Sequence, residues 1–74
     1  MTHYERIKQR LDSLQNGTRI DKEVANKLLR GTPGRIWYSN GRYGWSAKMA
    51  TCYRFNSAKA ALYDIIEYFK EGGY

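Results

Sequence analysis

The sequence predicts a single α+β domain, with two N-terminal helices, a three-stranded antiparallel sheet and a C-terminal helix packed on the sheet. Three observations predict this fold: a hairpin signal at Asn40-Gly41, helical periodicity on both sides of it, and a length of 74 residues. A chain of this length buries one small core, so residues 1–74 are expected to form one domain.

The first helix is predicted over about residues 3–15. Thr2 and Glu5 have the spacing of a capping box, and apolar residues then recur at helical spacing. The dipeptide Asn16-Gly17 interrupts this periodicity and indicates where the helix ends. The opposite face carries charges of both signs, which is typical of a surface exposed to solvent.

The second helix is predicted over about residues 21–30. Asp21 is a suitable N-cap, and a short amphipathic pattern follows it up to Gly31. Thr32-Pro33-Gly34 cannot continue a helix, because proline lacks the backbone donor and fixes its own φ angle.

Strands are predicted over about residues 35–39 and 42–49, joined by Asn40-Gly41 in a type I′ turn. A two-residue turn fixes the register, so Ile36 faces Trp45 and one side of the hairpin is the candidate core face. The candidate core side carries Ile36, Tyr38, Tyr43, Trp45, Ala47 and Met49. The opposite side carries Arg35, Trp37, Ser39, Arg42, Gly44, Ser46 and Lys48.

A third strand is predicted over about residues 52–55, and the last helix over about residues 57–71. The Ala50-Thr51 connection has no clear turn chemistry, so the face shared by Tyr53 and Arg54 stays open. Asn56-Ser57 suits a helix cap, and a wide apolar stripe follows it until Gly72-Gly73.

Basic residues and aromatic rings alternate through the predicted sheet. Between Glu23 and Asp64 the chain has no acidic residue but seven basic ones, and its net charge is +6. This combination is typical of a surface that binds a polyanion through ion pairs and ring stacking.

The candidate binding residues lie on one face of the predicted hairpin. Cations there would meet phosphates, and the indole of Trp37 would stack on an unpaired base. The alternative, that Trp37 is buried beneath one of the helices, stays open. The predicted site comprises Arg35, Trp37, Arg42 and Lys48, with Arg30 and Arg54 as nearby cations.

Catalytic, metal and cofactor sites are not expected. His3 is the only histidine and Cys52 the only cysteine, so no pattern of nucleophile and base or of metal ligands is present. The N-terminal residues have no apolar signal core and no apolar run is long enough to span a bilayer, so we expect a non-enzymatic cytoplasmic protein without a membrane partner.

Residues 35–69 resemble small DNA-binding modules of phage integrase arms and plant AP2-type domains. The likeness lies in the order of three strands and a helix and in the run Phe55-Asn56-Ser57-Ala58-Lys59-Ala60-Ala61-Leu62-Tyr63-Asp64. Those modules lay the sheet in the major groove, so the resemblance implies DNA contacts from Arg35, Trp37, Arg42 and Lys48.

The whole chain is also similar in style to small accessory proteins of phages and prophages. Some of these are αβα sandwich proteins in which a sequence segment similar to residues 18–25 precedes the sheet. This resemblance implies an inhibitor of the anti-CRISPR kind, which would contact a host protein or ribonucleoprotein complex rather than bare nucleic acid.

Other nucleic-acid-binding folds match less of the chain. Residues 3–30 have the size of a helix-turn-helix, but Glu23 on its second helix would repel phosphate. Gly31-Thr32-Pro33-Gly34 superficially resembles the loop of KH domains, but a strand rather than a helix follows it. Double-stranded RNA-binding domains share the order of a helix, three strands and a helix, but their basic cluster at the start of the last helix is reduced here to Lys59. A free sheet edge would permit a dimer as well as a monomer.

Overall fold

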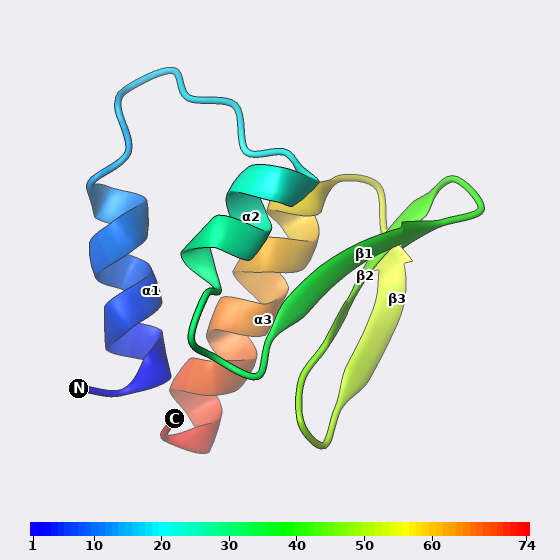
Figure 1. The fold of residues 1–74 in the computed structure, drawn as a ribbon. Coiled ribbons are helices and arrows are strands. Elements are labelled where there is room, and N and C mark those ends of the chain that lie inside the picture. The colour runs from blue at the N-terminus through cyan, green and yellow to red at the C-terminus, as the bar shows by residue number, and fades with distance from the viewer.

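The computed structural model of the protein describes residues 1–74 and confirms the predicted α+β fold. Its elements are α1 (His3–Asp12), α2 (Lys22–Leu28), β1 (Arg35–Ser39), β2 (Arg42–Ser46), β3 (Thr51–Phe55) and α3 (Ala58–Gly72). The strands form one antiparallel sheet in the order β1-β2-β3. All three helices lie on one side of this sheet, and no element covers its other side (Figure 1).

Helix α1 begins at the predicted capping box. The Thr2 hydroxyl accepts a hydrogen bond from the Glu5 N–H, and the Glu5 carboxylate accepts one from the Thr2 N–H. The Thr2 N–H and hydroxyl both donate to the Glu5 carboxylate, and these two hydrogen bonds lower the pKa of Glu5 below its ordinary value of 4.5. The helix ends at Asp12, before the predicted residue 15, because Ser13 caps it through its N–H and hydroxyl to the Gln9 carbonyl.

Helix α2 is held against the outer edge of β1. Its N-cap is Asp21, as predicted, and it ends at Leu28 rather than near residue 30. The Asn26 side chain accepts a hydrogen bond from the Ile36 N–H at 2.8 Å and donates one to the Ile36 carbonyl at 3.0 Å. One amide therefore replaces a missing strand at this position of the edge.

The hairpin has the predicted turn and register. Asn40 and Gly41 both have positive φ, 49° and 80°, as a type I′ turn requires. Ile36 pairs with Trp45, and both are buried beneath α3. Tyr38 was also expected in the core but is 52% exposed, because the hairpin tip extends beyond the helices (Figure 1).

The second strand is shorter than predicted. It ends at Ser46 instead of continuing to residue 49, and a turn follows in which the Ala47 N–H donates to the Ala50 carbonyl at 2.8 Å. Met49, expected on the core face, is therefore 84% exposed.

Helix α3 supplies about half of the core. Ser57 caps its N-terminus, and Gly73 ends it in the left-handed conformation. Its apolar stripe packs on the sheet and on α1 and α2, so the core lies between the sheet and the three helices. The buried core comprises Ile7, Ala25, Leu28, Leu29, Ile36, Trp45, Ala58, Ala61, Leu62, Ile65, Ile66 and Phe69.

Candidate functional site

The candidate site is the side of the sheet that no helix covers, which we call the open face. Trp37 on β1, Gly44 on β2 and Tyr53 on β3 occupy neighbouring register positions on it. The Trp37 and Tyr53 rings meet across Gly44, with ring centroids 4.9 Å apart and an interplanar angle of 19°. They form an aromatic pair at the centre of the open face.

Gly44 makes room for this pair. A Cβ added to Gly44 would lie 2.8 Å from Cζ2 of Trp37 and 2.9 Å from the Cys52 carbonyl oxygen, so any larger residue would clash. A glycine inside a strand commonly marks such a close approach. Its absent side chain lets the indole reach across the sheet to Tyr53.

Hydrogen bonds fix the orientation of both rings. The Trp37 Nε1–H donates to the Ser46 hydroxyl at 2.9 Å, and the Tyr53 hydroxyl donates to the Ser39 carbonyl. Both partners belong to the sheet itself. The aromatic pair is therefore ordered before any partner binds, which limits the entropy lost on binding.

Trp37 is half-buried without being part of the core. Its neighbours are Tyr53, Gly44 and Ser46, and none of these residues belongs to a helix. The alternative of burial beneath a helix is therefore wrong. Tyr53 is 38% exposed, so part of the pair contacts solvent.

Arg35 and Arg42 lie near opposite ends of the open face. Arg35 pairs with Ser46 at one end of the hairpin, and Arg42 pairs with Ser39 at the turn. Both side chains are exposed, and neither forms an ion pair. No acidic residue occurs in the sheet. Two free guanidinium groups thus flank the aromatic pair, and guanidinium groups bind phosphate through paired hydrogen bonds.

Lys48 lies outside the open face, contrary to the prediction. The prediction assumed that β2 continues to residue 49, but the strand ends at Ser46. Lys48 lies in the following turn, beside the C-terminal part of α3, where it lines a cavity with Tyr68 and Tyr74.

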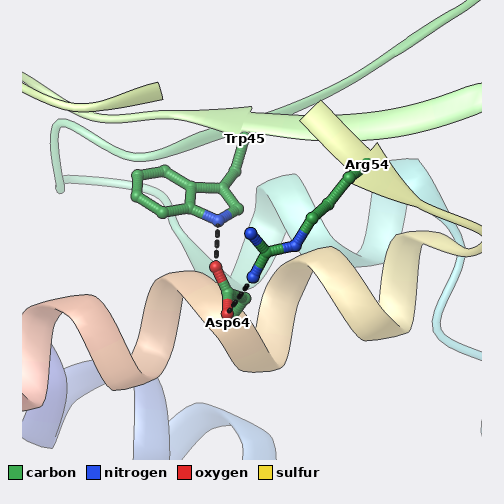
Figure 2. Close-up of polar contacts among 3 residues, drawn as sticks. All are labelled: Trp45, Arg54 and Asp64. Atoms are coloured by element: carbon green, nitrogen blue, oxygen red, sulfur yellow. Dashed lines mark hydrogen bonds and ion pairs between the residues drawn. The ribbon is translucent and has the colours of Figure 1, made fainter. Parts of the chain in front are cut away.

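Arg54 is turned toward the helices. A register irregularity between Tyr43 and Gly44 changes the alternation of β3. Figure 2 shows the Arg54 guanidinium directed at Asp64 of α3, 4.0 Å from its carboxylate, while Nε1 of Trp45 donates to the same carboxylate at 2.7 Å. This cation has an acidic neighbour and is separated from the aromatic pair.

Arg30 also lies away from the open face. It follows α2, and its carbonyl accepts a hydrogen bond from Nη1 of Arg10 at 2.6 Å. The adjoining Gly31 lies close to Arg6 of α1. Arg30 therefore belongs to a basic region on the helical side of the molecule.

Two residues of the site were not predicted from the sequence. The hairpin register does place Gly44 opposite Trp37, and a glycine there could have indicated a close contact. The sequence did not indicate Tyr53, because the side of the sheet on which it lies depends on two features. One is a turn without typical turn residues, and the other is the register irregularity in β3.

Comparison of the chain with protein-family models, curated proteins and solved structures gives no significant match. The resemblances to integrase-arm modules and phage accessory proteins therefore stay predictions. None of the three helices combines the length and apolar character needed to cross a membrane. No group of three or more His, Cys, Asp or Glu side chains is arranged to hold a metal ion.

Proposed function

We propose that the protein is a small non-enzymatic binding protein that takes single-stranded nucleic acid on the open face. The observation that carries this proposal is the ordered pair of Trp37 and Tyr53 between two unpaired arginines. Proteins that bind single strands without sequence preference typically combine aromatic rings, on which bases stack, with cations that contact the phosphates.

The choice of single strands follows from the position of the rings. Bases can stack on side chains only when they are unpaired, whereas a duplex offers its phosphates and groove edges. The aromatic pair occupies the centre of the open face, while Arg35 and Arg42 lie at its ends. Stacking is therefore the central contact of the proposed complex, and phosphate contacts are peripheral.

A nuclear magnetic resonance titration with single-stranded and duplex oligonucleotides tests this proposal. The two tryptophans provide separate indole N–H signals, since Trp37 lies on the open face and Trp45 beneath α3. We expect a single strand to shift the Trp37 signal in a saturable way and to leave Trp45 nearly unchanged. A duplex should bind more weakly at the same salt concentration.

The variant Trp37→Ala should weaken binding roughly 5- to 150-fold, as the loss of one base-stacking contact does. Its circular dichroism should remain that of the folded protein, because Trp37 is not part of the core. Trp45→Ala is the contrasting variant and should unfold the protein, since it empties a buried site. Equal affinity of Trp37→Ala and wild type for single strands would contradict the proposal.

The second candidate function is inhibition of a host protein or ribonucleoprotein complex by direct contact. Its supporting observation is the set of exposed large side chains, Tyr38 at the hairpin tip and Met49 in the β2–β3 turn among them. Absence of binding to any oligonucleotide at about 50 mM salt, where phosphate contacts are strong, would favour this function. Such an inhibitor should form a complex of fixed stoichiometry with its target.

A further inference from the structure

A cavity of about 210 Å³ lies at the end of the sheet opposite the hairpin tip. The residues that line it come mainly from the turn between β2 and β3, the start of α1 and the C-terminal end of the chain from α3 onward. Drug-sized ligands occupy pockets of about 300–1,000 Å³, so this cavity suits a single ring system rather than a larger molecule. Its lining includes His3, Lys48, Met49, Tyr68, Phe69 and Tyr74.

The aromatic walls of the cavity hold one another in place. Phe69 lies 5.8 Å from His3, 5.6 Å from Tyr68 and 6.1 Å from Tyr74, measured between ring centroids. The Tyr74 backbone is fixed as well, since its N–H donates to the Phe69 carbonyl and its oxygen accepts from the Tyr4 N–H. The cavity therefore exists before a ligand enters.

The electrostatics of the cavity favour an anionic group at its rim. Lys48 is the only lysine, arginine or carboxylate side chain in the lining, and it forms no ion pair. Burial and the neighbouring Tyr74 phenol raise the pKa of Tyr68 above its ordinary value of 10.0. A phenol is neutral at physiological pH, so Tyr68 adds no negative side-chain charge beside Lys48.

The cavity lies near the Arg35 end of the open face, on the helical side of the sheet. Arg35 pairs with Ser46, the last residue of β2, and Lys48 follows two residues later in the turn. A strand that runs along the open face from Arg42 past the aromatic pair to Arg35 therefore reaches the end of the sheet at which Lys48 lines the cavity. The next nucleotide has a cation for its phosphate and an aromatic cavity for its base.

From this arrangement we infer that the cavity binds one unpaired nucleobase of the nucleic acid on the open face, with the adjoining phosphate at Lys48. This inference rests on the proposed function and adds a second base-binding position to it. A flat ring between aromatic side chains is the usual mode of single-strand recognition. The size of the cavity matches one nucleobase, and Lys48 supplies a cation for the adjoining phosphate.

Titration with a nucleoside monophosphate tests the cavity alone. We expect saturable shifts of the Met49 methyl signal and of the Tyr68 and Tyr74 ring signals. Ribose 5-phosphate, which carries the phosphate without a base, should not reproduce them. Lys48→Gln should weaken nucleotide binding about 2- to 5-fold, as the loss of one exposed charge contact does. Lys59→Gln, the matched control on α3, should have no effect.

The inference is overturned if the monophosphate leaves Met49 and Tyr74 unshifted, or if ribose 5-phosphate shifts them equally. A single-stranded oligonucleotide added to the same sample distinguishes this failure from that of the proposed function, because Trp37 reports on the open face. If the Trp37 signal shifts and the Met49 and Tyr74 signals do not, only the inference is overturned. If the Trp37 signal does not shift, the proposed function is overturned.

Discussion

The missing side chain of Gly44 permits the central contact of the open face. Trp37 and Tyr53 belong to strands that are not neighbours, and their rings meet only because nothing rises from β2 between them. Glycine normally weakens a strand, since it has no side chain to pack. Here the indole covers the vacant position, and the ring contact offsets part of that cost.

Gly44→Ala should therefore destabilise the protein by about 1–3 kcal/mol, the usual range for overpacking a close-packed site. The added methyl group would meet the Trp37 ring on one side and the Cys52 carbonyl on the other, and the carbonyl belongs to the paired strand β3. Urea unfolding measures the change in free energy, and near-ultraviolet circular dichroism reports whether the aromatic pair separates.

Ser39→Ala is the control for this prediction, because Ser39 lies on the same face and contributes only its carbonyl to the hydrogen bond with Tyr53. Its stability should stay within about 0.5 kcal/mol of wild type. The prediction is contradicted if Gly44→Ala is as stable as Ser39→Ala and keeps the aromatic circular dichroism. The Trp37 indole would then accommodate a Cβ at position 44 without a clash.

At the scale of elements, the two edges of the sheet differ. Helix α2 lies along β1, and Asn26 satisfies both backbone groups of Ile36. No element of the chain lies along β3 (Figure 1). The contact between α2 and β1 thus fixes the hairpin relative to the helices and protects one edge from pairing with another chain.

Asn26→Ala should cost about 1–3 kcal/mol, because it leaves the N–H and carbonyl of the buried residue Ile36 without partners. Urea unfolding should show a lower midpoint at unchanged slope, and the Ile36 amide should exchange faster with solvent. Lys27→Ala, an exposed neighbour on the same helix, is the control. Equal midpoints for both variants would mean that the side-chain amide contributes no net stability.

Sequence patterns predicted the elements that local chemistry determines. Asn40-Gly41 fixed the hairpin register, and the Thr2–Glu5 box fixed the start of α1. The position of Lys48 was predicted wrongly and the face of Arg54 was left open, because they depend on where β2 ends and on the irregularity in β3. Neither feature has a turn residue that marks it, so only tertiary packing determines on which side these cations lie.

At the scale of the molecule, charge is divided between the two layers. All seven acidic residues lie in the helices or in the segments that cap them, whereas the sheet and its turns carry only basic ones. Asp64 of α3 lies beside Arg54 on the inner side, which leaves Arg35 and Arg42 as the cations of the open face. A polyanion should therefore approach the sheet rather than the helices.

The salt dependence of binding tests whether this division matters. Each phosphate contact on a single strand contributes about −0.7 to the slope of log K against log salt concentration, so the double variant Arg35→Ala/Arg42→Ala should reduce the slope by about 1.4. Lys22→Ala/Lys70→Ala removes the same net charge from exposed positions on α2 and α3. We expect this second variant to change the slope much less, because its lysines lie on the helical layer.

An equal reduction by both variants would mean that net charge alone attracts the strand. A reduction confined to the arginine variant would mean that the strand follows the open face, with its phosphates at the two ends of the aromatic pair.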